Sequence, residues 1–460
     1  MSELPSHAVG DARTSDFGWR LLTDLTDIGN RMAGSSGERR GAERVVEAYE
    51  TAGLRNAGLD GFEITGWWRG SSSLSLSGPV DRRHARSHEV IALPGSPAGT
   101  ATGPIVDVGD GTEAAFDAAG GRLDGAIAVT SSRTPDGHGR WIHRMEKYVS
   151  AVDRGAAGFV FRNHVEGALP PTGEVGYHDR PGPIPAVGVS KEVGDRLSRL
   201  ARAGRNERSD GDEGPRPTAT IDVDCRIEPT TSVNAVADVG PDTEDAVWLT
   251  AHVDAHDVSD GANDNGAGTA LVAAVGRLLA SVPDVLDQRV HLAAFGAEEI
   301  GLCGAHHAVE TAPHGTIDCV VNLDGACRSR DLRVSTNGFG ALRSTFETVA
   351  TEYGTPLAVD DSIAPHGDQW AFVQEGIPAA MASTSSSASG RGWGHTHADT
   401  LDKLDPRDLR EMAVLIAEAV VRLAGDDVEP IHRDRSAIRD ALHDGAVTEL
   451  KRGDRWPYDG

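Results

Sequence analysis

The stretch that decides the fold is DAVWLTAHVDAHDVSDGANDNGAGTALVAAVGRLLASV, residues 245–282. It opens with the apolar run DAVWLTA, passes through a polar loop of His, Asp, Asn and Gly, and ends in an apolar segment with helical spacing. We predict a strand over the first run and a helix from Gly266 to Val282. A strand that is apolar on both faces requires a sheet covered by helices on both sides.

The same alternation continues along the chain. Strand-like runs follow at QRVHLAAF (288–295), IDCVVNL (317–323) and IPAAMAS (377–383). Helical segments separate and follow them at 305–312, 342–354 and 405–425, the last with Asp405 as its cap and Pro406 at its first position. We therefore expect an α/β fold, with a mostly parallel mixed sheet covered by helices.

The first half of the chain has a different sequence pattern. Residues 16–59 are predicted to be helical, with the segment ERRGAERVVEAYETAGL ending near Gly53. Short β-like runs such as GAIAVTS begin after Trp67, and the polar stretch 203–217 is expected to be a loop. We divide the chain into an N-terminal helical part of the main domain (1–67), an inserted smaller α+β domain (68–230), the main sheet domain (231–425) and an acidic C-terminal tail (426–460).

Composition narrows the setting in which the protein works. The chain has 460 residues and a net charge of −26, with arginine supplying most of the positive charge. Nucleic acids and anionic membranes need basic patches, so we expect neither as a partner. An acidic, lysine-poor surface is typical of proteins from salt-loving organisms, and an acidic protein from a GC-rich genome is the alternative. No apolar run could span a membrane, the N-terminus lacks the pattern of a signal peptide, and the four cysteines form no pairing pattern. We expect a cytoplasmic protein with reduced thiols, of open oligomeric state.

Polar side chains follow the strands directly. Ligands in an open α/β sheet bind beyond the carboxyl ends of its strands, so these positions are candidates for a site. They are His252, Asp254, Asp264, Glu298, Glu299, Asp324 and His395. Glu298 and Glu299 are adjacent at the end of an apolar run, where a carboxylate is costly without a partner.

Two histidines and several carboxylates form a suitable ligand set for two divalent cations, with zinc favoured by the mixture of nitrogen and oxygen donors. A carboxylate shared between two metals holds them at the spacing that two-metal hydrolases use. Such a centre also needs a base for the proton of the attacking water, placed beside the metals without being a ligand.

Five motifs in this half of the chain carry a resemblance. The segments AHVDAHD…DGANDNGAGTALV, FGAEEIGLCGA, VVNLDGA and GHTHADT resemble the ordered H-x-D, [DN]-D-N, E-E, N-x-D and H-T-x-x-D-T motifs of the di-zinc aminopeptidase family. That family includes bacterial leucyl-type aminopeptidases, plasma glutamate carboxypeptidase and glutamate carboxypeptidase II. The resemblance covers residues 232 to about 425 and the helical start near DIGNRMAGSSGERRGAERV.

The resemblance implies a ligand set for two Zn²⁺ ions, with Co²⁺ or Mn²⁺ as alternatives. One metal would be held by His252 and Asp324, and the other by Glu299 and His395, with Asp264 bridging the two. The fold implied is that of the zinc peptidases.

It also implies roles beyond metal binding. Glu298 would be the general base that takes the proton of the bridging water and later protonates the leaving amine. Asp254 would orient His252 through its second ring nitrogen. A cis peptide is expected between Asp264 and Asn265.

Other histidines lie near these motifs in sequence. His256 follows His252 by four residues, but in a loop rather than on a helix face, so we do not expect it to be a ligand. His306 and His307 are expected on a helix behind the sheet. The H-T-x-x-D-T frame selects His395 as the ligand rather than His397.

The motifs say less about the residues that contact the substrate. Many relatives carry a tyrosine before the last histidine, whereas this chain has Gly394, so stabilisation of the oxyanion must rest on the metals or on another donor, such as Trp393 or His366. His366 and Asp368 lie where relatives have a loop near the substrate.

Within residues 68–230, the segments GRLDGAIAVTSS, YVSAVDRGAAGFVF and PIPAVGVSKEVGDRL resemble the protease-associated domain. In relatives this domain packs near the mouth of the active site, and an insertion without contact to the site is the alternative.

We expect a metallo-exopeptidase, an aminopeptidase acting on short peptides. A carboxypeptidase, dipeptidase or amide hydrolase of the same chemistry is the alternative, and it would need arginines near the site, for which Arg328, Arg330 and Arg391 are candidates. A catalytically silent binding protein is a further alternative, although no ligand position is missing.

Overall fold

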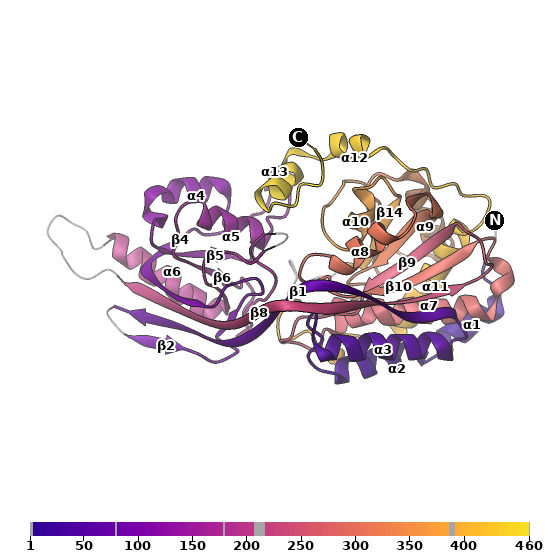
Figure 1. Cartoon of the computed structure of the whole chain (residues 1–460), viewed down its shortest axis with the longest axis horizontal. Coiled ribbons are helices and arrows are strands. Elements are labelled where there is room, and N and C mark those ends of the chain that lie inside the picture. The colour runs from indigo at the N-terminus through magenta and orange to yellow at the C-terminus, as the bar shows by residue number, and fades with distance from the viewer. Residues whose placement is uncertain (1–2, 79–80, 178–179, 207–216, 386–391, 460) are drawn as a thin grey trace.

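Two long antiparallel strands, β1 (Arg55–Ser77) and β8 (Thr218–Val239), run through both lobes of the molecule (Figure 1). The computed structural model describes residues 3–78, 81–177, 180–206, 217–385 and 392–459. Each lobe builds its sheet on an end of this pair, so the strands form one path of hydrogen-bonded neighbours from the larger lobe into the smaller one.

The sheet of the larger lobe is mixed, as expected. Its strands follow the order β13–β12–β14–β11–β9–β10–β8. The four central strands are parallel to one another. They are β9 (Ala246–His252), β10 (Arg289–Phe295), β11 (Ile317–Leu323) and β14 (Ala379–Thr384). Antiparallel pairing begins at the flanks, where β8 lies against β10 and β12 (Leu332–Ser335) against β14, with β13 (Leu357–Asp360) parallel to β12. The parallel centre brings four carboxyl strand ends to one edge.

Helices cover both faces of this sheet (Figure 1). On one face lie α1 (Ser6–Thr14), α2 (Phe17–Asp27), α3 (Ser36–Thr51), α7 (Ala267–Ser281), α9 (Gly340–Tyr353) and α11 (Pro406–Leu423). The other face carries α8 (Cys303–Thr311) and α10 (Gln369–Val373). The Asp405 side chain caps α11 by accepting from the Arg407 N–H, as the sequence predicts.

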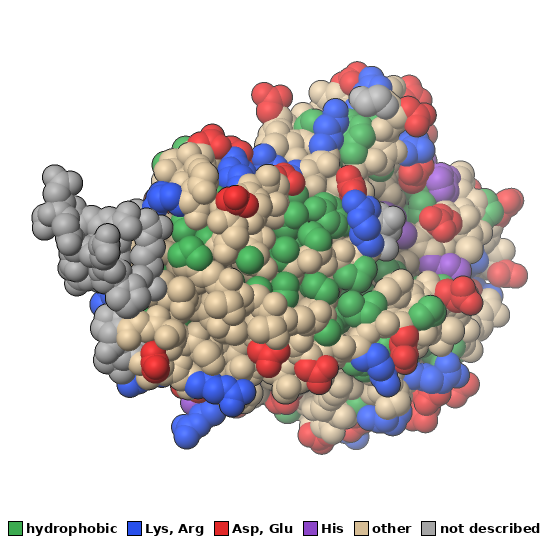
Figure 2. All heavy atoms as spheres, turned by 60° about the vertical axis from the view of Figure 1, so that its left-hand side comes forward, with side chains coloured by type: hydrophobic (Ala, Val, Ile, Leu, Met, Phe, Trp, Pro, Cys, Tyr) green, Lys and Arg blue, Asp and Glu red, His purple; other side chains and the backbone are tan. Residues whose placement is uncertain are grey.

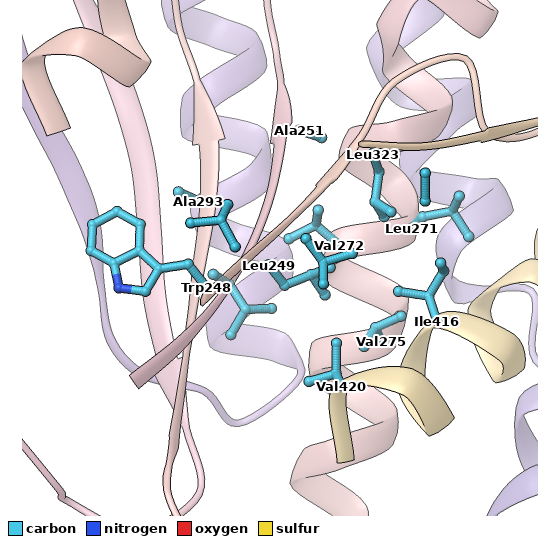
Figure 3. Close-up of a cluster of buried hydrophobic side chains, with 14 of the residues drawn as sticks. Trp248, Leu249, Ala251, Leu271, Val272, Val275, Ala293, Leu323, Ile416 and Val420 are labelled. Atoms are coloured by element: carbon cyan, nitrogen blue, oxygen red, sulfur yellow. The ribbon is translucent and has the colours of Figure 1, made fainter. Parts of the chain in front are cut away.

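The apolar character of β9 on both faces follows from this layering. Leu249 faces α7 and α11, where it meets the aliphatic side chains of Val272 and Val275, while Trp248 points to the opposite side (Figure 3). The Trp248 ring packs against Phe372 of α10, with ring centroids 5.6 Å apart. Burying each such side chain stabilises the fold by about 1.5–3 kcal/mol, which fixes the strand and therefore the place of its last residue.

The smaller lobe carries its own mainly parallel strands. They are β4 (Gly99–Asp107), β5 (Ile127–Ser131), β6 (Gly158–Arg162) and β7 (Ala186–Val189), with β3 (Val90–Ala92) antiparallel to β7 and β2 (Arg82–His84) paired with β1. The helices are α4 (Glu113–Ala119), α5 (Arg144–Val152) and α6 (Lys191–Asn206). This lobe joins the larger one through the antiparallel pairing of β4 with β8.

Two local predictions differ from the structure. The helical region was expected to reach residue 59, but β1 begins at Arg55, because this segment pairs with β8 and the pairing overrides its local sequence pattern. The domain boundaries proposed at 67/68 and 230/231 stay predictions, and these positions lie within β1 and β8, the strands that both lobes share. Of the polar stretch 203–217, α6 extends to Asn206, and residues 207–216 lie outside the described residues.

The acidic C-terminal segment folds back onto both lobes. It forms α12 (Arg435–Ala441) and α13 (Asp444–Arg452), and α13 lies between the lobes in Figure 1. Arg452 donates to the Ser150 hydroxyl on α5 at 2.8 Å. The buried carboxylate of Glu449 pairs with Arg455 at 2.9 Å and lies 3.5 Å from the His366 ring of the larger lobe. Within the described parts of the chain, no helix is both long and apolar enough to cross a membrane.

Candidate metal centre

The carboxylate of Asp264 lies between two imidazoles. Its Oδ1 atom is 3.4 Å from Nε2 of His252, and its Oδ2 atom is 3.1 Å from Nε2 of His395. His252 is the last residue of β9, and Asp264 lies in the turn Ala262–Gly266 that leads into α7. The peptide bond between Asp264 and Asn265 is cis, as the resemblance implied.

Ligand-type atoms converge in two groups, each with its atoms within 4.8 Å of one another. One group contains His252, Asp264 and Asp324, and the other contains His256, Glu299 and His395. Asp264 contacts a histidine of each group, so the two groups form one centre. The structure therefore brings all five predicted metal-binding residues together and adds His256, which the sequence analysis did not expect there.

The two adjacent glutamates are held by the carboxylate of Asp254. Its Oδ1 atom accepts from the Glu298 N–H at 3.1 Å, and its Oδ2 atom accepts from the Glu299 N–H at 3.2 Å. The same Oδ1 atom lies 3.4 Å from Nδ1 of His252. Nδ1 of His252 also contacts the backbone carbonyl of Asp254 at 3.2 Å, so Asp254 contacts both the turn after β10 and the histidine at the end of β9.

The side chains of the pair then diverge. Oε2 of Glu299 lies 3.3 Å from Nε2 of His395, within the second group. Glu298 belongs to neither group, and its Oε2 atom is 3.9 Å from Nε2 of His252. This separation matches a division into one ligand and one neighbouring base.

The electrostatics of the centre reflect its crowding. Burial and the charge of Glu299 raise the pKa of Glu298 well above its usual value. Burial and the charge of Asp264 raise the pKa of Glu299. For His252, burial alone would lower the pKa, but the nearby carboxylates outweigh it and hold the pKa well above the usual range. So many acidic groups in one buried place call for positive charge.

The donor atoms fit zinc. Nε2 of His252, both ring nitrogens of His256 and Oε1 of Glu299 are buried and have no hydrogen-bond partner among the described residues. Buried polar atoms are rarely left unpaired, since each costs about 1–3 kcal/mol. A borderline divalent cation that takes imidazole nitrogen and carboxylate oxygen would satisfy them.

Two supporting carboxylates extend this framework. Asp399, the acidic residue of the H-T-x-x-D-T motif, accepts from the backbone N–H groups of Asn263 and Asp264 at 2.9 and 3.0 Å. Glu38 accepts from the Ala297 N–H at 3.0 Å, and thereby holds the backbone just before the glutamate pair. Asp399 is part of that motif but was not singled out as a site residue, and Glu38 lies in the helical N-terminal part and carried no signal of this role.

A buried arginine organises the loop after β9. The guanidinium of Arg31 donates to the carbonyls of Val253, Asp260 and Gly261 at distances between 2.8 and 3.0 Å, and also to Leu25. The loop that carries the ligands from His252 to Asp264 is therefore held from inside. A single arginine in the segment DIGNRMAG gives no sign of this role in the sequence.

The remaining histidines lie elsewhere, mostly as expected. His306 and His307 lie on α8, where His307 is 3.1 Å from the carboxylate of Asp60. His397 is exposed and belongs to neither group of ligand atoms. His366 stacks on His143 of the smaller lobe, with ring centroids 5.5 Å apart. Asp368 is fully buried, and both its oxygens lack a hydrogen-bond partner in the described part of the chain.

A cavity of about 220 Å³ opens beside His395 between the two lobes. The smaller lobe supplies Arg144, Trp141 and Phe161 to its wall, and the loop of the larger lobe supplies Gly394. Apolar side chains gather across the middle of the face that Figure 2 shows. The smaller lobe therefore contacts the site and is not a remote insertion.

The arginines that the sequence suggested have other contacts. Arg328 lies over the Trp393 ring at 4.6 Å, and Arg330 pairs with Asp408 at 2.6 Å. Arg391 lies outside the described residues. The arginines that line the cavity are Arg133 and Arg144, which carried no signal of this position in the sequence because they belong to the inserted segment.

Comparisons with known proteins agree with this architecture. Residues 234–420 match the family model for peptidase family M28, and residues 101–197 match the model for the PA domain. Aminopeptidase YwaD of Bacillus subtilis (strain 168) is 26% identical over 428 residues, which cover 90% of this chain and 85% of the relative.

Two solved structures share the whole arrangement of lobes. The peptidase M28 precursor of Shewanella amazonensis SB2B has a TM-score of 0.77 at 23% identity, covering 93% of this chain and 97% of the other. BSAP, a zinc aminopeptidase from Bacillus subtilis, has a TM-score of 0.68 at 24% identity, covering 93% and 98%. At these identities the likeness concerns the fold.

Proposed function

Because the chain belongs to peptidase family M28 and carries an inserted PA domain, we propose that it is a two-zinc exopeptidase, an aminopeptidase that hydrolyses short peptides. The observation that carries this proposal is the position of Asp264, whose two oxygens face the imidazoles of two separate ligand groups. The related YwaD is named an aminopeptidase, and BSAP a zinc aminopeptidase, which supports this choice of substrate end and metal.

The metal-binding residues divide into two sets. His252 and Asp324 would hold one zinc ion, Glu299 and His395 would hold the other, and Asp264 would be shared. Co²⁺ and Mn²⁺ are alternatives to zinc for this mixture of donors. When bound, the pair of ions supplies Lewis acidity to the scissile carbonyl and acidifies a water molecule.

Glu298 handles the proton. Its carboxylate lies 3.9 Å from Nε2 of His252 and belongs to neither ligand group, which suits a general base. It takes a proton from the attacking water and returns it to the leaving amine. Burial raises the pKa of its carboxyl, and a raised pKa makes the carboxylate a stronger proton acceptor.

The positions of these groups depend on Asp254. Its carboxylate accepts the backbone N–H groups of both glutamates and lies beside Nδ1 of His252. This contact keeps Nε2 of His252 directed at Asp264, since the two ring nitrogens lie on opposite sides of the ring.

One observation favours a second candidate, a carboxypeptidase or dipeptidase of the same chemistry. Arg133 and Arg144 line the cavity beside His395, and a guanidinium suits a substrate carboxylate. Nε of Arg144 also donates to the backbone carbonyl of Glu174 at 2.9 Å. Gly394 lines the same cavity and, without a side chain, leaves space there.

Hydrolysis of a panel of blocked dipeptides tests the choice. An aminopeptidase cleaves a dipeptide with a blocked carboxyl group and fails when the amine is blocked. Cleavage that survives an amine block and is lost with a carboxyl block would establish a carboxypeptidase, and loss of cleavage with either block would establish a dipeptidase. Arg144→Ala should then raise KM for free dipeptides, whereas it should have little effect on an enzyme that reads the amine alone.

A further inference from the structure

His256 occupies a position that its sequence context did not suggest. It lies in the loop after β9, four residues beyond His252, and its side chain is buried. Its Nε2 atom is 2.9 Å from Oε2 of Glu299, closer than any other imidazole comes to that carboxylate in the described residues. Its ring meets that of His395 edge to face, with centroids 4.5 Å apart.

An ordinary buried histidine would be hydrogen-bonded, and this one is not. Neither ring nitrogen of His256 has a hydrogen-bond partner among the described residues, and Oε1 of Glu299 also lacks one. A buried imidazole and a buried carboxylate that form no hydrogen bond have lost their contacts with water and gained no polar contact in exchange. Donor atoms that converge in this way are those that a cation satisfies.

The loop that carries His256 is anchored through the neighbouring residue. The carboxylate of Asp257 accepts two hydrogen bonds from the guanidinium of Arg69 on β1, one from Nη2 at 2.7 Å and one from Nε at 3.0 Å. The pair is largely shielded from solvent, with side chains 10% and 14% exposed. A buried two-point contact of this kind fixes the direction of the backbone beside it.

The same arginine connects to the opposite histidine. Nη2 of Arg69 also donates to the Thr172 hydroxyl at 3.1 Å, and the Thr172 N–H donates to the carbonyl of His395 at 2.8 Å. One chain of contacts through the smaller lobe therefore holds the backbone of both His256 and His395.

We propose that His256 is a further protein ligand of the metal ion held by Glu299, His395 and Asp264. This inference rests on the proposed two-metal centre and adds to its ligand set. That ion then has two imidazoles and two carboxylates, which fill a tetrahedral zinc site. The ion at His252 and Asp324 has fewer protein ligands and keeps room for the substrate carbonyl. The extra nitrogen donor favours zinc or cobalt over manganese at the closed site.

Zinc binding by the whole chain tests the assignment. Metal-free protein is titrated with Zn²⁺ in competition with a chromophoric chelator, for the wild type, His256→Ala and the control His397→Ala. We expect two zinc equivalents in the wild type and in the control. In His256→Ala, the affinity for one zinc equivalent should fall by on the order of 10²-fold, and the affinity for the other should stay unchanged. Even the loss of a residue that only supports a ligand lowers metal affinity by about 10–100-fold.

The outcomes separate this inference from the function on which it rests. A wild type that binds no pair of zinc ions overturns both. If the wild type binds two equivalents of zinc and His256→Ala binds both with unchanged affinity, the ligand role of His256 alone is overturned. This holds even if the turnover of the variant falls. X-ray absorption at the zinc edge of the loaded wild type gives a second measurement that needs no variant. Three imidazoles shared by two zinc ions support the proposal, and two contradict it.

Discussion

Nδ1 of His252 lies 3.4 Å from Oδ1 of Asp254, and the same oxygen accepts the backbone N–H of Glu298. The carboxylate that we propose orients His252 therefore also holds the backbone of the proposed base. The two functions share one buried carboxylate, and a change at this carboxylate should affect both.

Asp254→Asn tests this coupling. The amide turns a donor towards one of the two backbone N–H groups, so the turn after β10 loses an acceptor and His252 loses its anionic neighbour. We expect zinc affinity to fall by about 10–100-fold and kcat to fall with it at saturating zinc. Zinc titration and steady-state kinetics measure the two effects. A fall in affinity with normal kcat at full loading would show that Asp254 does not position Glu298.

The adjacent glutamates should respond differently to the same change. Glu298→Gln removes the proposed base and should lower kcat by roughly 10²–10⁴-fold while both zinc ions stay bound. Glu299→Gln removes a ligand of the second group and should release zinc. Metal analysis after gel filtration, together with turnover, distinguishes them. If the first variant loses zinc and the second keeps it, the two assignments are reversed.

Removing the Arg31 side chain should destabilise the ligand-bearing loop. Arg31→Ala leaves the buried carbonyls of Val253 and Gly261 without their donor, at a cost of about 1–3 kcal/mol for each unsatisfied group. The matched control is Arg39→Ala, because Arg39 pairs with Glu43 on the exposed surface of α3, where such a pair contributes about 0.5 kcal/mol. Urea unfolding of metal-free protein measures both. If the two variants lost the same free energy of unfolding, the role of Arg31 in holding the loop would be refuted.

The docking of the C-terminal segment should depend on pH through Glu449. Burial alone would raise the pKa of this carboxyl, but His366 and Arg455 outweigh it and lower the pKa to about 2. A depressed pKa contributes stability that is complete above the unfolded-state value of ~4.3 and is lost as the pH falls towards about 2.

Glu449→Gln should therefore be less stable than the wild type by ~3 kcal/mol near neutral pH, and this difference should shrink below pH ~4.3. Denaturant unfolding at neutral and acidic pH gives the comparison. A difference that stays constant with pH would mean that the variant acts through packing and not through charge.

The acidic surface leads to a prediction about salt. With a net charge of −26, self-repulsion opposes the compact state, and molar salt shortens the Debye length to ~3 Å. We propose that the protein is adapted to high salt, and expect its melting temperature to rise steeply from dilute buffer to molar KCl. A melting temperature independent of KCl would refute the adaptation and favour an ordinary acidic protein.

The site could be predicted from the sequence because its residues follow strands. His252 ends β9, Asp324 directly follows β11, and Glu299 lies four residues beyond β10, and a parallel sheet brings such strand ends to one edge. The motifs then divided the roles between the two glutamates. Periodicity and strand ends are local signals, which is why the larger lobe was predicted well.

What the sequence did not show depends on contacts between distant segments. His256 was set aside because its spacing from His252 suits a helix, whereas a loop held by Arg69 and Asp257 places it beside Glu299. Arg144 reaches the site only because β1 and β8 carry the smaller lobe alongside it.

The central claim is that two metal ions and the Glu298 carboxylate perform the hydrolysis. Metal analysis of the purified chain, followed by chelation and restoration with Zn²⁺, tests it most directly with a dipeptide substrate. The account predicts about two equivalents of metal per chain, no turnover once they are removed, and recovery only as the second equivalent returns. Full turnover in a metal-free preparation would contradict it.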